Sequence, residues 1–318
     1  MNPGVLRQGI DIDPQSLLQI RFMAGALQFP PLHRVSSNMG GRYTSNIRGR
    51  GIDFDEVRRY QPGDDIRNMD WRVTARTDKP HTRIYKEEKE RPVIMAVDLG
   101  KTMQFGTKRA FKSVTAAETA ALLGWAASNN QERVGGVIFS ESNHIESRPA
   151  SGNRGVLRLI NTMTRFNAEQ KKTESKKADN DYFYKAILRM KSIARPGSMI
   201  IIISDFQQTT EKCWTLIDNL SQHCDLIFIN IFDKLETTPP VSGRYGITDG
   251  KNRTILDTTD RKTVLSYETL YRLHKNRIDE YCKKRGITTI QASTEFGCKD
   301  ILNQLVSSNR RYRQRKRA

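Results

Sequence analysis

Beyond residue 92 the chain alternates between two hydrophobic patterns. Short continuous apolar runs predict strands buried on both faces, and segments whose apolar residues recur every three or four positions predict amphipathic helices. The predicted strands are 92–98, 133–140, 197–206, 225–232 and 287–292. The predicted helices are 108–130, 154–165, 181–193, a segment through Trp214, 264–286 and 299–308. This alternation predicts an α/β, Rossmann-like fold with a mostly parallel sheet and helices on both faces.

Two shorter features add to this sheet. The segment "HIESRP" at 144–149 predicts a short strand that accompanies 133–140. Further on, Asp249-Gly250 stands between two alternating segments and predicts the tight turn of a β-hairpin.

The first 92 residues lack the alternation and predict a smaller N-terminal α+β subdomain. A helix is expected near 15–28, followed by a loop rich in glycine, serine and asparagine. The segment 53–60 predicts a short helix that Asp53 caps, with Glu56 reaching back. A second helix is expected over 66–76 with Asp65 as its cap, and "HTRIYKE" at 81–87 alternates like a strand. We therefore divide the chain into 1–92, an α/β domain at 93–308 and a basic tail at 309–318.

Composition places the chain among globular proteins that bury a core. It has 318 residues, of which 37% are hydrophobic and 28% charged. No apolar run approaches the roughly 20 residues that span a bilayer, and the start of the sequence lacks the pattern of a secretory signal, so we expect a cytoplasmic protein. Its four cysteines are widely spread without a C-x-x-C pair, and its five histidines lack zinc-site spacing. We expect reduced thiols and no zinc site.

The net charge of +18 suggests an acidic partner such as nucleic acid. Six of the positive charges, however, lie within 309–317, and four lysines crowd 169–180. Both runs are typical of solvated segments, and no aromatic residues interleave with the arginines as they do in single-strand binders. Nucleic-acid binding through the basic surface and tail therefore stays open as an alternative function.

Candidate chemistry gathers where two predicted strands end. In an open parallel sheet, ligands bind outside the carboxyl ends of the strands, at the point where the strand order reverses. If 92–98 and 197–206 are neighbours there, Asp98, Thr102, Ser204 and Asp205 converge in one crevice. Two carboxylates with hydroxyl oxygens are ligands that suit Mg²⁺. The alternative is that each aspartate caps the helix that follows it.

Two enzyme classes can be weighed at the same loop. "GKT" at 100–102 lacks the earlier glycine of a phosphate-binding loop, because position 95 is methionine. "DLGKT" at 98–102 is similar to the aspartate loop of haloacid-dehalogenase phosphatases, but Gly100 replaces their proton-donating aspartate. Neither class is supported, and an enzyme that uses a divalent ion at Asp98 and Asp205 is the third functional hypothesis.

The stretch from "RGRGIDFDEVRRYQPGDDIRNMDWRVTART" through "PVIMAVDLGKTMQFGT", residues 48–107, resembles the bacterial family called domain of unknown function fifty-eight. The resemblance implies a von Willebrand factor type A-like domain at 93–308, a metal-ion-dependent adhesion site, and a frequent association with MoxR-type AAA+ ATPases. Its implied Mg²⁺ ligands are Asp98, Thr102 and Asp205. The site is degenerate, because Gly100 stands where the family usually has a serine and Asn180 where a threonine is expected.

The segment 48–77 itself admits two interpretations. Its arginines and carboxylates nearly balance, so they can form a scaffold of ion pairs. Alternatively some remain available to a partner, with Asp65, Asp70 and Trp71 as the candidate partner-binding residues, because tryptophan and arginine dominate interface hot spots. We expect a non-enzymatic protein-binding adaptor that works with a MoxR-type AAA+ ATPase on a client protein during maturation or remodelling, with nucleic-acid binding as the alternative.

Overall fold

The structure is a computed structural model that describes residues 9–25, 52–62, 66–87, 91–172, 181–248, 252–298, 300, 301 and 304. The chain forms two compact units. The larger contains residues 1–36 and 91–318, and the smaller contains residues 37–90.

A six-stranded sheet forms the centre of the large unit. Its order is β10-β7-β6-β3-β4-β5, and every neighbouring pair is parallel except β4 with the edge strand β5. The strands are β3 (Pro92–Asp98), β4 (Arg133–Phe139), β5 (His144–Ala150), β6 (Met199–Ser204), β7 (Asp225–Phe232) and β10 (Thr288–Ser293). From β3 the chain continues through β4 to β5 at one edge of the sheet, and then crosses to β6 on the other side of β3. The strand order therefore reverses between β3 and β6, which defines a doubly wound sheet and confirms the predicted fold class.

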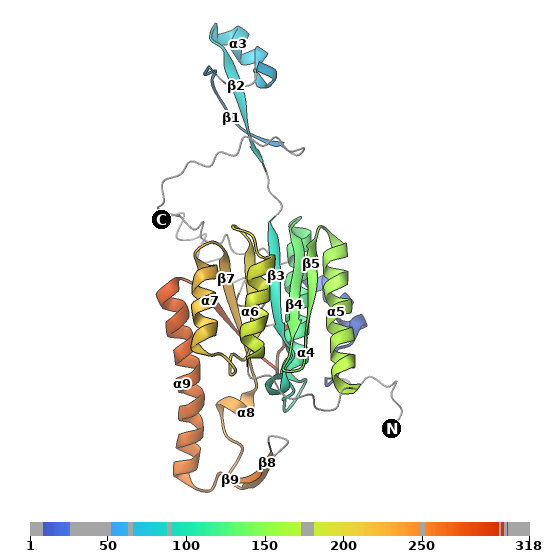
Figure 1. Cartoon of the computed structure of the whole chain (residues 1–318), viewed down its shortest axis with the longest axis vertical. Coiled ribbons are helices and arrows are strands. Elements are labelled where there is room, and N and C mark those ends of the chain that lie inside the picture. The colour runs from blue at the N-terminus through green and yellow to red at the C-terminus, as the bar shows by residue number, and fades with distance from the viewer. Residues whose placement is uncertain are drawn as a thin grey trace. The chain divides into compact units, whose positions relative to one another are not determined.

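Helices cover both faces of this sheet (Figure 1). One face carries α1 (Pro14–Gln19), α2 (Arg21–Ala24), α4 (Lys112–Asn129) and α5 (Asn153–Lys172). The other carries α6 (Tyr182–Ile193), α7 (Glu211–Ser221) and α9 (Arg261–Arg285). Strand β3 shows how one strand serves both cores, because Val93, Met95 and Val97 enter the first and Ala96 the second.

Residues 9–25 belong to the large unit, which differs from the predicted division at residue 92. Ile12, Leu17 and Ala24 are buried in the first core. The indole Nε1 of Trp125 on α4 donates to the carbonyl oxygen of Leu17 at 3.2 Å. The apolar side of this short helical segment is covered by α4, which explains why it packs with the sheet rather than with residues 52–87.

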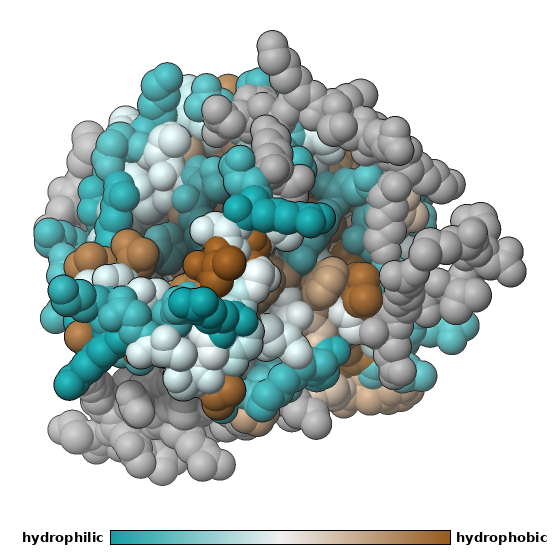
Figure 2. Space-filling model, turned by 90° about the horizontal axis from the view of Figure 1, so that it is seen from below, coloured by the Kyte–Doolittle hydropathy of each residue, from teal (hydrophilic) through white to brown (hydrophobic). Residues whose placement is uncertain are grey.

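The carboxyl edge of the sheet carries four further short elements of the large unit. They are η2 (Lys101–Met103), α8 (Lys234–Thr237), β8 (Arg244–Thr248) and β9 (Arg253–Asp257). They lie at the lower end of the unit in Figure 1, and Figure 2 looks directly onto that end. The antiparallel pairing of β8 with β9 confirms the predicted hairpin, while its turn at Asp249-Gly250, most of the predicted helix 299–308 and the tail 309–318 lie outside the described residues.

The small unit is a two-stranded hairpin with helical turns in its connection. Its elements are β1 (Ile52–Arg59), η1 (Ile66–Asn68), α3 (Trp71–Thr77) and β2 (His81–Glu87). The predicted helix at 53–60 is wrong, because this segment is β1 and pairs antiparallel with β2. The register shifts between Phe54 and Glu56. One extra residue in a strand changes its side-chain spacing from two to three, which imitates a helical pattern.

The helix of the small unit starts later than predicted. Asp70 is its N-cap, and the Asp70 carboxylate accepts hydrogen bonds from the backbone N–H groups of Arg72 and Val73 at 3.0 and 3.1 Å. The Asp70 backbone N–H also donates to His81 O at 2.8 Å. Asp65, the predicted cap, lies outside the described residues.

Two other predictions concern the whole chain. All four cysteines lie among the described residues, are buried and form no disulfide, in agreement with reduced thiols. Among the described residues, we find no helix with the length and apolar character required to cross a membrane.

Candidate functional site

The switch point of the sheet brings Asp98 and Ser204 together as the sequence predicts. Asp98 ends β3 and Ser204 ends the neighbouring strand β6. The Ser204 hydroxyl donates to Asp98 Oδ2 at 2.6 Å, and the backbone N–H of Gly100 donates to Asp98 Oδ1 at 2.9 Å. Asp98 is 1% exposed, so the cluster is an internal one.

Asp205, the next residue, faces a buried lysine. Lys112 Nζ lies 2.7 Å from Asp205 Oδ2 and 2.6 Å from Glu236 Oε1. The lysine side chain is 1% exposed and stands in the first turn of α4, whereas Glu236 comes from α8. Two carboxylates from distant parts of the chain therefore share one ammonium.

The backbone at Phe206 fixes the direction of this turn. Phe206 has φ = 56°, which places a bulky residue in the left-handed region and costs on the order of 1–3 kcal/mol. Its backbone N–H donates to the Ser204 hydroxyl at 3.0 Å, and its ring stacks on Phe228 at 4.9 Å between centroids. A hydrogen bond and a buried aromatic contact thus hold the strained residue beside Asp205.

Neither aspartate caps the α-helix that follows it, so the capping alternative is wrong. The N-cap of α7 is Thr210, and the turn η2 starts at Gly100 without a side-chain cap. Asp98 and Asp205 instead each accept from the backbone N–H two residues on, at 2.9 and 3.1 Å, which is the hydrogen bond of an Asx turn.

Glu141 and Tyr182 close the cluster over Gly100. The Glu141 carboxylate accepts from the backbone N–H of Lys101 at 2.8 and 3.1 Å. A Cβ on Gly100 would lie 3.0 Å from Glu141 Oε1 and 3.0 Å from the Tyr182 hydroxyl oxygen. The hydroxyls of Tyr182 and Thr102 are both buried without a hydrogen bond of regular geometry. Gly100, where the resemblance leads us to expect serine, is therefore crowded by these neighbours.

The electrostatics of the cluster follow from burial and like charge. Burial and the nearby Asp205 carboxylate raise the pKa of Asp98 to about 8, while the hydrogen bonds from Ser204 and Gly100 work in the opposite direction. Burial opposes the charged form of Lys112, but Asp205 and Glu236 outweigh it and raise the lysine pKa. Burial and the surrounding carboxylates also raise the pKa of Tyr182. The cluster therefore holds more carboxylate than it has buried positive charge to balance.

A second network fixes α8, the helix that supplies Glu236. Asp233 caps α8, and Glu236 accepts from the backbone N–H of Asp233 at 2.9 Å to complete a capping box. Asp233 also accepts from the hydroxyls of Thr107 and Thr294 at 2.7 and 2.5 Å. Burial alone would raise the pKa of Asp233, but these hydrogen bonds lower it below the ordinary value.

The predicted Mg²⁺ ligands Asp98, Thr102 and Asp205 fit a divalent ion poorly. Lys112 already provides a cation to Asp205, and both oxygens of Asp98 accept hydrogen bonds. In the described part of the chain, no group of three or more acidic, histidine or cysteine side chains is arranged to hold a metal. Metal binding at these residues stays a prediction, and the buried ammonium is the observation against it.

Reasoning from sequence missed Lys112, Glu236, Glu141 and Tyr182. For Lys112 the sequence carried a signal, because the residues of α4 are apolar or small on nearly all sides of the helix. The structure agrees with this pattern, since fifteen of the eighteen residues of α4 are buried. A lysine in the first turn of such a helix is expected to be buried with a partner. Glu236 had no comparable signal, since it stands in a short polar segment 124 residues away from Lys112.

The structure describes two of the three predicted partner-binding residues, and their environments differ. Asp70 is 6% exposed and its carboxylate caps α3, so it supports the fold. Trp71 is 67% exposed and remains a candidate contact, whereas Asp65 lies outside the described residues. The proposed ion-pair scaffold of 48–77 stays a prediction.

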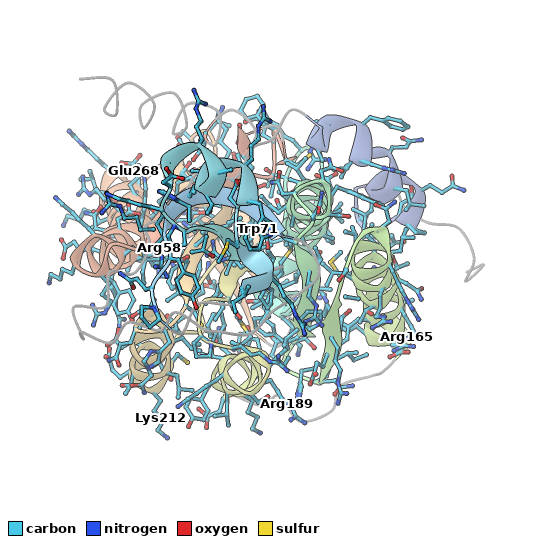
Figure 3. The ribbon with its side chains drawn as sticks, turned by 90° about the horizontal axis from the view of Figure 1, so that it is seen from above. Arg58, Trp71, Arg165, Arg189, Lys212 and Glu268 are labelled. Carbon is cyan, nitrogen blue, oxygen red and sulfur yellow. The ribbon has the colours of Figure 1, made fainter. Side chains whose placement is uncertain are left out.

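The described cations of the large unit are spread over several helices. Figure 3 shows Arg165, Arg189 and Lys212 projecting outward from α5, α6 and α7. Such scatter does not define a groove for a nucleic-acid backbone, and the basic tail lies outside the described residues. The alternative of nucleic-acid binding gains no support from this arrangement.

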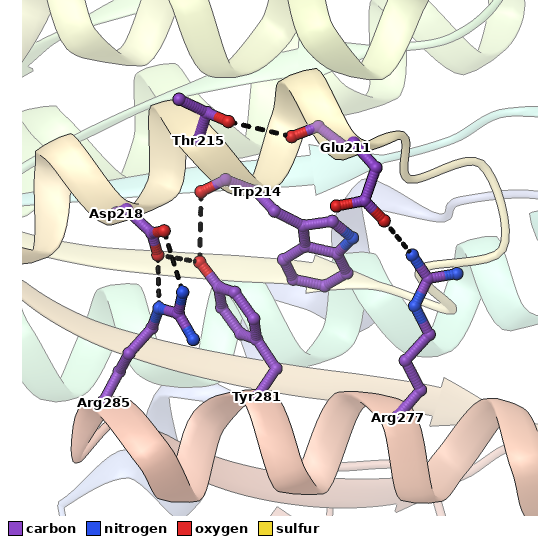
Figure 4. A pocket seen from close by; sticks show the side chains of 7 residues that line it. All are labelled: Glu211, Trp214, Thr215, Asp218, Arg277, Tyr281 and Arg285. Carbon is purple, nitrogen blue, oxygen red and sulfur yellow. Dashed lines mark hydrogen bonds and ion pairs between the residues drawn. The ribbon is translucent and has the colours of Figure 1, made fainter.

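A shallow pocket between α7 and α9 lies apart from the switch point (Figure 4). Its polar groups are largely paired with one another. Arg277 pairs with Glu211 at 2.6 Å, Arg285 with Asp218, and the Tyr281 hydroxyl donates to the backbone oxygen of Trp214 at 3.1 Å. These contacts join α9 to α7, and we assign the pocket a structural role.

The strand order and the cluster at its switch point define a doubly wound α/β protein of Rossmann-like type. The chain belongs to the family described as protein of unknown function DUF58, whose sequence model matches residues 56–277. This confirms the family predicted from the signature at 48–107.

Relatives with curated sequences include uncharacterized proteins of Mycobacterium tuberculosis and Mycobacterium bovis. Each is 28% identical over 253 residues, which covers 79% of this chain and 75% of the relative. Two solved structures are also similar. The conserved hypothetical protein BatB of Bacteroides thetaiotaomicron has a TM-score of 0.42 and 14% identity over 70% of this chain and 99% of its own. A von Willebrand factor type A protein of Catenulispora acidiphila has a TM-score of 0.35 and 8% identity over 72% and 44%. Both TM-scores are low, so the fold assignment rests on the strand order of the chain itself.

Proposed function

We propose that this protein is a non-enzymatic, cytoplasmic interaction adaptor that works with a MoxR-type AAA+ ATPase in maturing or remodelling other proteins. The observation that carries the proposal is the buried triad of Lys112, Asp205 and Glu236. It lies at the switch point, where a doubly wound sheet ordinarily binds its ligand. The triad fills that position with the protein's own charges, which leaves the outer surface as the means of recognition.

The chemistry of the cluster also favours a structural role for its carboxylates. A general base needs access to a substrate proton at hydrogen-bond distance. Asp98 and Asp205 are 1% and 3% exposed, and both accept internal hydrogen bonds. The ATPase partner is proposed from the family resemblance, in which association with MoxR-type ATPases is frequent.

Affinity purification from the native host, with and without ATP, tests the proposal. The tagged protein is expected to recover a AAA+ ATPase, identified by mass spectrometry, in a nucleotide-dependent amount. Trp71→Ala should reduce the recovery, because Trp71 is an exposed aromatic side chain in the family signature. Phe22→Ala is the matched control, since Phe22 is 88% exposed but lies outside that signature.

Recovery of no ATPase under conditions that preserve weak complexes would refute the proposed partnership. Equal loss in the Trp71 and Phe22 variants would show that the signature has no special part in binding.

A further inference from the structure

Helix α9 has one face attached to the domain and one face without a partner among the described residues. Of its 25 residues, only Ile278 and Cys282 are buried. At about 100° per residue, Tyr267, Tyr271 and His274 lie on the same side as Ile278. The Tyr267 hydroxyl donates to Leu235 O at 2.7 Å, and Nε2 of His274 donates to Asp205 O at 2.9 Å. The inner face of α9 therefore contacts α8 and Asp205 of the switch-point cluster.

The outer face of α9 carries large apolar side chains. Leu265, Leu270 and Leu273 are 52%, 70% and 60% exposed. At about 100° per residue, Leu265 and Leu273 lie in the half of the helix opposite the inner face, and Leu270 lies at the border of that half. Buried leucine is the rule in a globular protein, and a group of exposed leucines on a well-formed helix marks an interaction surface. Figure 2 shows apolar side chains among polar ones at the end of the large unit that carries the carboxyl edge of the sheet.

Cations stand among these leucines. Arg261, Lys262 and Arg272 are exposed and fall in the same half of the helix. None of the three forms a side-chain hydrogen bond or ion pair within the described part of the chain. Glu268, visible in Figure 3, is the acidic residue at the edge of this face. The outer face, which we define as Arg261, Lys262, Leu265, Leu270, Arg272 and Leu273, is therefore apolar and net positive.

We propose that this outer face of α9 docks an acidic amphipathic helix of a partner protein. Leucines supply the apolar contact into which such a helix lays its own apolar side, and the three cations select acidic flanking residues by charge complementarity. The inference deepens the proposed adaptor function and rests on it, because it assigns the surface that receives the partner. His274 and Tyr267, on the opposite side of the same helix, contact Asp205 and α8.

A defined peptide tests the inference without any ATPase. The probe is a fluorescein-labelled helical peptide of about 18 residues, roughly five turns, with leucines on one face and glutamates on the other. Fluorescence anisotropy of the full chain should show saturable binding that weakens with salt. A peptide with lysines in place of the glutamates should bind at least about tenfold more weakly.

Two variants of the outer face locate the binding. Leu270→Asp combined with Leu273→Asp should weaken binding by at least about tenfold, as should Arg261→Glu combined with Arg272→Glu, which changes surface charge alone. Leu157→Asp combined with Leu188→Asp is the matched control, because these leucines of α5 and α6 are 45% and 46% exposed. Circular dichroism and thermal unfolding verify that each variant folds.

Several results would overturn the inference. They are absence of binding to the acidic peptide, equal binding of the lysine peptide, or unchanged binding by the Arg261 and Arg272 variant. Binding of phosphatidylglycerol vesicles in place of the peptide, or a dimer that the leucine variant dissociates, would assign the face to a membrane or to a second copy. These failures leave ATPase recovery as an independent result, so the proposed function can stand when this inference falls.

Discussion

Replacing Lys112 by methionine tests whether the buried ammonium holds the switch point together. Methionine keeps the length of the side chain but leaves Asp205 and Glu236 without the cation that lies 2.7 and 2.6 Å away. Removal of one member of a buried ion pair typically costs about 3–5 kcal/mol, because the remaining charge stays desolvated. Burial is nearly complete at Lys112 and Asp205, so we expect Lys112→Met to lower the free energy of unfolding by about that amount near neutral pH.

The pH dependence follows from the raised pKa of Lys112. A group whose pKa is higher in the folded state stabilises the fold fully below its unfolded pKa of 10.5, and that stability is lost as pH rises through the folded value. Measurement near pH 7 therefore captures the whole effect. In Lys112→Met the loss should shrink toward about pH 5, because an unpaired buried carboxylate takes up a proton.

Urea unfolding followed by tryptophan fluorescence is the assay. In a Trp71→Phe background, the remaining tryptophans Trp125 and Trp214 report on the large unit alone. Lys101→Met is the matched control, since Lys101 is exposed and a surface change of this kind costs less than about 0.5 kcal/mol. A loss below about 1 kcal/mol in Lys112→Met, or an equal loss in Lys101→Met, would refute the reasoning.

Three further outcomes are expected at the same cluster. Millimolar Mg²⁺ should leave the Tm of the wild type unchanged but raise that of Lys112→Ala, whereas a wild-type shift that Asp98→Ala abolishes would instead support the predicted metal site. The free energy of unfolding of the wild type should fall as pH rises between about 4 and about 8, because the pKa of Asp98 is about 8 in the fold against an ordinary value of 3.8. Urea titrations at several pH values measure this slope, and Asp98→Asn should flatten it. Gly100→Ala should cost about 1 kcal/mol by crowding Glu141 and Tyr182, and thermal unfolding should show a smaller cost when Tyr182→Phe removes one crowding oxygen.

The sequence predicts the sheet well because its central strands are buried on both faces. Such strands appear as continuous apolar runs, and the helices between them show their own spacing. The meeting of Asp98 and Ser204 was predictable for the same reason, since the carboxyl ends of neighbouring parallel strands lie at one edge. Residues 53–60 were assigned wrongly because a bulge changes the spacing of a strand, and local capping signals could not reveal the pairing with β2.

The site was predicted less completely because its decisive contacts join distant residues. Lys112 is separated by 93 residues from Asp205 and by 124 from Glu236, and only the strand order brings them together. Spacing within the loop 98–102 could identify Asp98 and the absence of the serine that the resemblance leads us to expect. It could not identify Lys112, whose ammonium faces Asp205.

Lys112 gives a physical account of how Asp205 can remain a carboxylate in the interior. With Gly100 where the resemblance leads us to expect serine, a divalent ion would lack one oxygen ligand, and Glu141 and Tyr182 crowd that position. Asp205 still requires a positive charge when it is ionised in the interior, and the ammonium of Lys112 supplies it from within the chain. Because this cation is covalently attached and does not dissociate, Asp205 keeps a charge partner without a bound ion.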